Sequence, residues 1–284
     1  MDELIQKAYE DISQHFLSKH GSTIDAIIAY GSMINNTATP DSHYDCWIIV
    51  NDYKMFHKRN KDDYKDYKLW FMRHPETHVY LNELGPNFYQ ETINAKEVKY
   101  GVIDLKDFRR ACRSGLRMYV KARFQKPVRI IYATKKVLPE IKNNILRARI
   151  GGVNLALKLL PKRFSLSDLI NEIVRMSYKA DIRLESPTKV ENIVKKNWHE
   201  LVEIYKPLVE SRPYIYQLDG VYQNNRYKRY NKKRAYGYLK RKAWVAMLLN
   251  IKNGLTNKKA IPYVKRKFNR AFRKRKIESN INKG

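Results

Sequence analysis

Residues 24–50 contain the pattern in this chain that is best suited to phosphate chemistry. An apolar run that ends at Tyr30 is followed at once by Gly31 and Ser32, and a second apolar run begins directly after Asp45. A glycine and a serine after a buried strand allow backbone N–H groups and one hydroxyl to approach a phosphate. A carboxylate at the start of the next strand can hold a metal ion against that phosphate. The pattern therefore predicts a strand, a phosphate-binding turn and a second strand that carries a metal ligand.

The spacing within this pattern narrows its interpretation. Twelve residues separate Ser32 from Asp45, which resembles the spacing in the polymerase-beta-like nucleotidyltransferases. An ordinary β-hairpin is the alternative, with a turn that contains Gly-Ser and an aspartate that caps the loop. The segment alone leaves both interpretations open.

The elements that must position these residues are predicted from the periodicity of the apolar side chains. We expect an α+β fold in which a nucleotidyltransferase-type mixed sheet with flanking helices is followed by a small helical domain and a basic C-terminal helical tail. The expected domains are residues 1–136 (nucleotidyltransferase), 137–215 (helical) and 216–284 (membrane-associating tail). The expected helices of the first domain span about residues 2–19 and 108–120, with a short one after residue 50, and the expected strands span residues 24–29, 46–50, 78–82, 98–104 and 128–132.

The charge of the chain is concentrated in its last part. The formal net charge is +29, which predicts an anionic partner such as nucleic acid, an acidic membrane surface or a phosphorylated substrate. Residues 221–284 hold 21 Lys or Arg and one acid, so they carry +20 and leave +9 for the first 220 residues. Aliphatic and aromatic side chains such as Trp244 and Phe268 lie between these cations. We expect this segment to bind an anionic membrane as a basic helix, with a disordered tail as the alternative from Lys258 onward.

The composition excludes several classes of protein. A hydrophobic fraction of 43% is typical of a folded chain, and no run approaches the 18 or so apolar residues of a membrane-spanning helix. Cys46 and Cys112 are too few for a disulfide scaffold or a cysteine-based metal site. The first sixteen residues are acidic and amphipathic, unlike a signal or transit peptide.

Short motifs along the chain occur in an order that points to one family. They read AYGS at 29–32, aspartate at 45, HxxN at 57–60 with tyrosine at 67, VYLN at 79–82, VKYGVI at 98–103, YVKARFQKPV at 119–128, LLPKRFSLSDL at 159–169 and MSYKADIR at 176–183. Together they resemble the mitochondrial translocator assembly and maintenance family, whose members are phosphatidate cytidylyltransferases (CDP-diacylglycerol synthases). The resemblance covers about residues 29–205, and we find no counterpart for the tail beyond Pro213.

The resemblance implies a reaction between a nucleotide and a lipid. Phosphatidate would attack the α-phosphorus of CTP, giving CDP-diacylglycerol and pyrophosphate, with Mg²⁺ as cofactor, in phosphatidylglycerol and cardiolipin biosynthesis. A phosphate oxygen is already anionic, so positioning and charge neutralisation can carry catalysis without a strong general base. The family also implies a peripheral membrane location, at the matrix face of the mitochondrial inner membrane or, for a bacterial relative, at the cytoplasmic face of the plasma membrane.

The same resemblance implies roles for the residues around the turn. Gly31 and Ser32 would bind the β- and γ-phosphates through backbone N–H groups and the hydroxyl. Asp45 would hold Mg²⁺ between the CTP phosphates. Lys99 and Tyr100 would contact the triphosphate or the cytidine, and Ser32, Asp45 and Lys99 are the expected catalytic residues.

Further residues are expected to bind substrate phosphate or to close the cleft. The resemblance assigns the phosphate contacts to Arg123 and Lys126, the Arg contact being bidentate; a solvated surface cation is the alternative for each. Asp181 and Arg183 would act from the helical domain, with a helix-end ion pair as the alternative. The members of this outer set are Tyr30, Arg123, Lys126, Ser177, Tyr178, Asp181 and Arg183.

The resemblance assigns no second metal ligand. The wider superfamily has a second carboxylate two residues after the first, where this chain has Trp47, and the family resembled here also lacks an acid at that place. Asp41 and Asp104 are the candidates for a second metal ligand. His57 and Asn60 match the family, and no role is implied for them.

Two competing functions come from the basic, tyrosine-rich segments. A run such as YQNNRYKRYNKKRAYGYLKRK at residues 222–242 could bind single-stranded nucleic acid by stacking and charge. The chain could then be a nucleotidyltransferase that acts on RNA, or an RNA-binding protein without enzyme activity. Nucleic acid is therefore the less favoured partner, behind CTP, phosphatidate and the membrane.

Overall fold

The computed structural model describes residues 3–67, 69–113, 118–179 and 187–227. Its first unit is built around a five-stranded sheet with the strand order β3-β4-β2-β1-β5. β2 and β4 are parallel, and the other neighbouring pairs are antiparallel. The strands are β1 (Ile24–Tyr30), β2 (Tyr44–Val50), β3 (Asn87–Ile93), β4 (Lys96–Asp104) and β5 (Arg129–Ala133).

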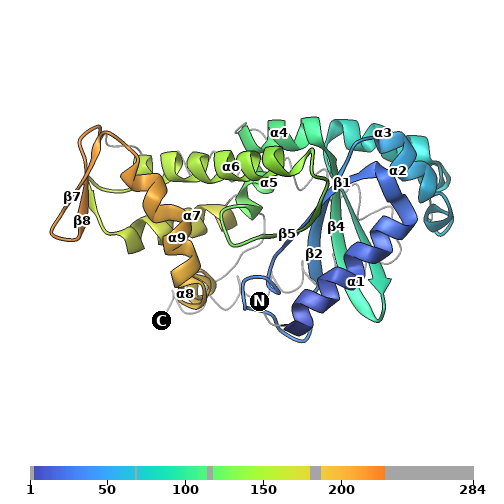
Figure 1. The fold of residues 1–284 in the computed structure, drawn as a ribbon, viewed down its shortest axis with the longest axis horizontal. Helices are drawn as coiled ribbons and strands as arrows, with labels where there is room; N and C mark the ends of the chain where they lie inside the picture. Colours follow the sequence, from blue (N-terminus) through green and yellow to red (C-terminus); the bar gives the residue numbers. More distant parts are fainter. Residues whose placement is uncertain (1–2, 68, 114–117, 180–186, 228–284) are drawn as a thin grey trace, which may run out of the picture.

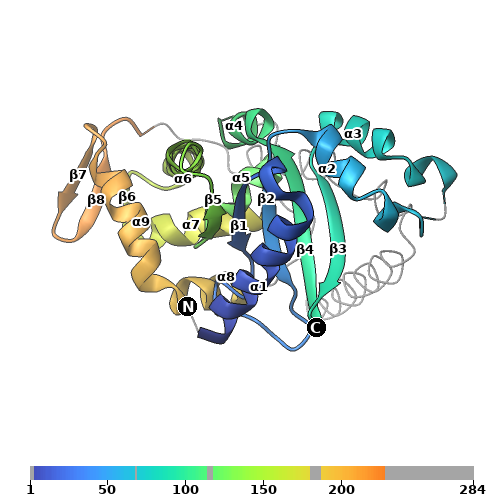
Figure 2. The same ribbon diagram turned by 45° about the vertical axis from the view of Figure 1, so that its right-hand side comes forward.

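Helices cover both faces of this sheet (Figures 1 and 2). α1 (Glu3–His20) packs Ile12 and Phe16 against one face, together with strand residues such as Ile27 and Ile48. The central strands read as continuous apolar runs because both of their faces are buried. The opposite face is covered by α4 (Leu105–Arg113), α5 (Met118–Arg123) and the first half of α6 (Leu138–Leu159).

Shorter elements lie beside the β3–β4 edge. The helices there are α2 (Tyr53–Arg59) and α3 (Pro75–Leu84), which pack against each other. The 3-10 helices are η1 (Gly21–Thr23), η2 (Asp62–Tyr64) and η3 (Trp70–Arg73).

The second unit has its own hydrophobic cluster of helix and strand residues. A three-stranded sheet with the order β6-β8-β7 closes one end of it (Figure 1). Its elements are the second half of α6, α7 (Leu166–Lys179), α8 (Pro187–Lys196), α9 (Trp198–Glu210), β6 (Arg163–Phe164), β7 (Ile215–Leu218) and β8 (Val221–Asn224).

The structure bears on the expected domain limits in two places. α6 places Ile141 and Ala148 in the core of the five-stranded sheet, and Val153 and Leu157 in the core of the second unit. A limit at residue 136 therefore stays a prediction, and it would not separate the two cores. The β7–β8 hairpin falls within the expected tail but packs on the second unit through Tyr222. The rest of the expected tail, residues 228–284, lies outside the described residues.

The expected α+β class is confirmed, and one predicted element is wrong. Residues 78–82 were expected to form a strand and lie instead in α3, where Pro75 begins the helix. His78 and Asn82 are one helical turn apart and both buried. The strand that pairs with β4 is β3, which follows this helix. Within the described ranges, no helix is long and apolar enough to cross a bilayer.

Candidate functional site

The turn after β1 brings Gly31 against the side chain of Asp45. Tyr30, the last residue of β1, lies opposite Asp45 in the β1–β2 register. Gly31 has a φ of +93°, and a Cβ built on it would collide with Asp45 Oδ2. Only glycine tolerates both this backbone conformation and the close approach of the carboxylate. The predicted strand, Gly-Ser turn and second strand are therefore present, with the carboxylate directly beside the turn.

The turn itself is held by hydrogen bonds to its first two carbonyl groups. The backbone N–H of Asn35 donates to the carbonyl oxygen of Gly31 over 3.0 Å, and the buried amide of Asn35 donates to the same oxygen over 2.6 Å. The N–H of Thr37 donates to the carbonyl oxygen of Ser32 over 3.0 Å. These bonds fix the backbone around Ser32, whose side chain is half-buried.

Asp45 and Lys99 lie on the same face of the sheet. They are direct neighbours in the parallel β2–β4 register, so their side chains point to the same side. Both are half-buried. The carboxylate of Asp45 makes no hydrogen bond or ion pair with any residue that the structure describes, which leaves its oxygens available to a cation.

Within the described segments, Asp45 is not part of a larger group of metal-ligating side chains. No three His, Cys, Asp or Glu side chains of the described segments form a group that could hold a metal ion. Asp104 lies opposite Val50 at the far end of β4, about 16 Å along the strand from Lys99 at the usual rise per residue, and it accepts a hydrogen bond from the N–H of Asp107. Asp41 lies in an exposed turn. A metal ion here would have Asp45 as its ligand from the strands.

Trp47, which stands where the wider superfamily has a second carboxylate, is part of the hydrophobic core. Trp47 is fully buried, and its ring stacks on Tyr30 with centroids 6.0 Å apart. It also covers Gly101, where a Cβ would collide with the indole. Trp47 therefore supports the strands beneath the site and is not a metal ligand.

Tyr100 is not brought to the site. Its side chain lies on the opposite face of the sheet, edge-on to Phe16 at 4.8 Å and stacked on Tyr89 at 5.4 Å between ring centroids. Its hydroxyl lies 3.5 Å from Glu91 Oε2, and burial raises the pKa of the phenol well above its usual value. Because neighbouring strand residues point to opposite faces, the side chains of Lys99 and Tyr100 lie on different sides of the sheet.

One expected cation, Arg123, lies near the turn, and the other, Lys126, lies against the end of α7. The Arg123 guanidinium is 5.6 Å from the centroid of the Tyr30 ring, and Tyr30 is the residue across from Asp45. Lys126 is buried, with Nζ 3.4 Å from Ser177 Oγ and 4.3 Å from the centroid of the Tyr178 ring. The segment after α5 therefore joins the end of α7.

Part of the expected site lies outside the described residues. Asp181 and Arg183 belong to residues 180–186, which the structure does not describe. Their expected role in closing the cleft stays a prediction.

The second unit also touches the turn through residues that the sequence did not indicate. The buried amide of Asn197 donates to the carbonyl oxygens of Asn35 and Ile193, each over 2.9 Å. Lys196 Nζ donates to the carbonyl oxygen of Asn36 over 2.8 Å. An asparagine after a helix is a common residue, so nothing in the sequence distinguished it. These bonds connect the end of α8 to the turn that follows Gly31.

We expect Asn197→Ala to loosen the turn. The change leaves the buried carbonyl oxygen of Asn35 without its donor, which costs about 1–3 kcal/mol, and we expect the affinity for CTP to fall about tenfold. Urea denaturation and calorimetric titration with CTP measure the two effects. Asn192→Ala, at an exposed position of α8, is the control. Unchanged CTP affinity despite lost stability would show that the contact only supports the fold.

The His57 motif lies in a buried network away from the turn. His57 Nδ1 lies 2.5 Å from the Tyr64 hydroxyl, and Nε2 lies 2.7 Å from Asn82 Oδ1. The amide of Asn82 donates to the carbonyl oxygen of Val102 over 2.8 Å. His78 is part of the same cluster and stacks on Tyr64 with centroids 3.8 Å apart. The motif therefore holds α2 and α3 to β4.

This network predicts a loss of stability in mild acid. Burial lowers the pKa of His57 to about 3 and that of His78 to about 4, from 6.5. Below pH 6.5 the unfolded chain binds more protons than the folded chain, so stability falls as the pH drops toward these values. Between pH 7 and pH 5 we expect a loss of roughly 1–2 kcal/mol per histidine.

Urea denaturation at both pH values measures this loss. His57→Gln should reduce the pH dependence by the share of one histidine, whereas His199→Gln, at an exposed position, should leave it unchanged. Equal pH dependence in all three proteins would contradict the role of His57.

The comparison with known proteins gives the family. The family described as "Phosphatidate cytidylyltransferase, mitochondrial" matches residues 13–282, which is nearly the whole chain. The chain belongs to this family. The match confirms the resemblance drawn from the motifs, and it extends through the basic segment beyond Pro213, for which the motifs had given no counterpart.

Relatives with the family's name come from distant organisms. Proteins named mitochondrial phosphatidate cytidylyltransferase are 29% identical over 212 residues in Homo sapiens (70% of this chain, 46% of that protein), 30% over 179 residues in Schizosaccharomyces pombe (56% and 44%) and 27% over 218 residues in Drosophila melanogaster (69% and 60%). The chain thus spans about half the length of these relatives.

A nucleotidyltransferase-like protein from Exiguobacterium sibiricum is among the solved structures that the chain matches. It is 10% identical, with a TM-score of 0.28 over 75% of this chain and 83% of that chain. The family assignment rests on the sequence matches.

Proposed function

We propose that this chain is a phosphatidate cytidylyltransferase, which transfers CMP from CTP to phosphatidate and releases pyrophosphate. The observation that carries the proposal is the contact between Gly31 and the carboxylate of Asp45, beside Lys99. A phosphate placed on the backbone of the turn would lie between a cation-binding oxygen and an ammonium group. The relatives are named for this reaction.

The chemistry requires little beyond positioning and charge. A phosphate oxygen of phosphatidate forms a bond to the α-phosphorus of CTP, and the bond from that phosphorus to the bridging oxygen of the β-phosphate breaks, so pyrophosphate leaves with the electron pair. The attacking oxygen is already anionic, so no strong base is needed. Ser32 and the N–H groups of the turn would bind the departing phosphates, while Lys99 and Arg123 neutralise charge. Lys126 would pair with the phosphate of the lipid.

A magnesium ion fits this donor set. Mg²⁺ is commonly bound by one or two carboxylates together with substrate phosphate oxygens and water. Asp45 supplies one carboxylate that has no protein partner among the residues that the structure describes. Bound there, the ion would offset negative charge on the phosphates of CTP. Asp45 would hold it at the turn, where Gly31 leaves room for the carboxylate.

The proposed substrate sets the proposed location. Phosphatidate is an anionic membrane lipid, so the enzyme must reach the bilayer surface. The net charge of +20 in residues 221–284 is suited to a peripheral contact with anionic lipid. The names of the relatives suggest a mitochondrial membrane, and we propose the matrix face of the inner membrane. In a bacterium, the corresponding place would be the cytoplasmic face of the plasma membrane.

One assay tests the proposal against its competitors. Purified protein of residues 1–284 is incubated with radiolabelled CTP, Mg²⁺ and either phosphatidate liposomes or single-stranded RNA. We expect labelled CDP-diacylglycerol and an equal amount of pyrophosphate with the liposomes, loss of both when EDTA is added, and no labelled RNA. Label in RNA without lipid turnover would replace the proposal by an RNA nucleotidyltransferase, and no label in either substrate would reject an enzyme.

A further inference from the structure

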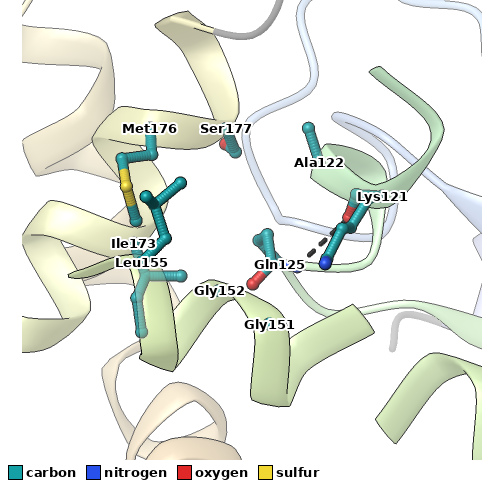
Figure 3. Close-up of a pocket in the computed structure, with 9 residues that line it drawn as sticks. All are labelled: Lys121, Ala122, Gln125, Gly151, Gly152, Leu155, Ile173, Met176 and Ser177. Carbon is teal, nitrogen blue, oxygen red and sulfur yellow. Dashed lines mark hydrogen bonds between the residues drawn. The ribbon is translucent and has the colours of Figure 1, made fainter. Parts of the chain in front are cut away.

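A small pocket lies where α5, the middle of α6 and the end of α7 meet (Figure 3). The pocket is partly open, and its space together with the open solvent at its mouth amounts to about 280 Å³. Three apolar side chains lie on one side of the pocket, and Lys121, Ala122 and Gln125 lie on the other (Figure 3), so that most of the exposed lining is apolar. The lining residues are Lys121, Ala122, Gln125, Gly151, Gly152, Leu155, Ile173, Met176 and Ser177.

The cation of this pocket is Lys121. The residue is 9% exposed, and its ammonium group makes no hydrogen bond or ion pair with any residue that the structure describes. Burial lowers the pKa of this ammonium. A buried cation without a carboxylate partner is costly unless a ligand compensates it. Lys121 therefore has the surroundings of a ligand-binding group.

Two glycines in α6 provide the space for these polar side chains. A Cβ on Gly151 would collide with Lys121 Nζ, and a Cβ on Gly152 would collide with Gln125 Oε1. Glycine is among the poorest residues for the interior of a helix. Gln125 is held in place by hydrogen bonds from its amide to the carbonyl oxygen of Ala148 over 2.9 Å and from the Tyr205 hydroxyl to its backbone carbonyl over 2.8 Å. Because Gly151 and Gly152 have no side chains, the Lys121 ammonium group and the Gln125 amide fit between α5 and α6.

The pocket adjoins the residues that we propose to bind substrate phosphate. Ser177 lines it, and the Ser177 hydroxyl lies 3.4 Å from Lys126 Nζ. Ser177 therefore lies between the pocket that holds Lys121 and the ammonium group of Lys126.

The space beside Gly151 that a Cβ would fill is called the notch, and the Lys121 ammonium group lies in it. We infer that this ammonium group binds a phosphate group, which enters the pocket past Ser177. The inference rests on the proposed function and adds a phosphate-binding residue to it. Two sources share this chemistry, the phosphomonoester of phosphatidate and the pyrophosphate product. The apolar wall of Leu155, Ile173 and Met176 suits a phosphate that is attached to an apolar group.

The test measures binding without turnover. The full chain and its Lys121→Met variant are titrated in a calorimeter with dihexanoyl phosphatidate, with inorganic pyrophosphate and with CTP. Loss of one charged hydrogen bond is expected to weaken the phosphate ligand about 10- to 100-fold, while the affinity for CTP stays unchanged. A weaker dihexanoyl phosphatidate complex assigns the pocket to the lipid headgroup, and a weaker pyrophosphate complex assigns it to the product. Lys158→Met, at an exposed position of α6, is the control.

Two further readouts separate ligand binding from a role in the fold. Lys121→Met removes a buried charge, so its Tm should equal or exceed that of the parent protein. Gly151→Ala keeps the charge but fills the notch, and we expect it to weaken the same ligand while the protein stays folded. Unchanged affinity for both phosphate ligands in Lys121→Met overturns the inference, whether or not the protein turns over phosphatidate. Absence of turnover in the parent protein, with the binding loss intact, rejects only the proposed function.

Discussion

Asp45→Asn is expected to lower kcat/KM for CDP-diacylglycerol synthesis by about a thousandfold. The change keeps the size of the side chain and its fit against Gly31, but it removes the charge that would hold a metal ion. The free energy of unfolding should change little, because the carboxylate has no hydrogen bond or ion pair among the described residues. Steady-state assays over a range of Mg²⁺ concentrations measure the effect, and the Mg²⁺ requirement should shift to higher concentration.

An aspartate on the surface provides the comparison for this variant. Asp66 is exposed, and Asp66→Asn should retain the parent rate at every Mg²⁺ concentration. If Asp45→Asn retains the parent rate as well, the carboxylate holds no metal and the proposed site is wrong.

Gly31→Ala is expected to damage both the fold and the activity. Alanine at a φ of +93° is strained, and its Cβ would collide with Asp45 Oδ2. Backbone strain and overpacking together should cost about 2–4 kcal/mol of stability. Displacement of the carboxylate by about 1 Å should lower kcat about a hundredfold. Urea denaturation and steady-state assays, both at saturating Mg²⁺, measure the two effects.

A second glycine separates backbone strain from the collision. Gly220 has a φ of +77°, and a Cβ on it would meet nothing within 4 Å. Gly220→Ala should therefore show the strain alone, with full activity. In a protein that already carries Asp45→Asn, adding Gly31→Ala should lower kcat little further, since the group that it displaces is no longer functional. A full hundredfold loss in that background would mean that Gly31 acts through the turn and not through Asp45.

The strand–turn–strand core of the fold could be predicted because its residues are buried on both sides. Two short apolar runs, separated by Gly31 and the residues up to Asp45, are typical of central strands. The structure has these strands at Ile24–Tyr30 and Tyr44–Val50. The Gly-Ser turn has a glycine where the backbone needs a positive φ. Local sequence and long-range structure agree here, so the prediction succeeded.

Residues 78–82 were predicted wrongly as a strand, and β3 was not predicted, because neither segment shows an apolar pattern typical of its element. His78 and Asn82 lie on the buried side of α3 and make hydrogen bonds there to backbone carbonyl groups, so this side of the helix has no continuous apolar stripe. β3 is an edge strand of largely half-exposed polar residues, and its sequence has no apolar run to mark it. The periodicity of apolar residues reveals buried apolar side chains, but it does not reveal polar side chains that are buried and hydrogen-bonded.

The site was predictable in its parts but not in its assembly. Alternation along β4 separates Lys99 from Tyr100, a point that strand geometry alone could have supplied. The contact of Asn197 with Asn35 joins residues that are far apart in the chain. A single sequence holds no record of such a pairing, because asparagine is common on protein surfaces.

The long helix α6 determines how the molecule loses its structure. At the usual rise per residue its 22 residues form a rod of about 33 Å, and its two halves complete different hydrophobic cores (Figure 1). Removing its first half would expose the sheet, and fraying its second half would open the helical cluster. Thermal or chemical unfolding should therefore be a single cooperative transition, in which the turn at Gly31 and the lysines beside α7 are lost together.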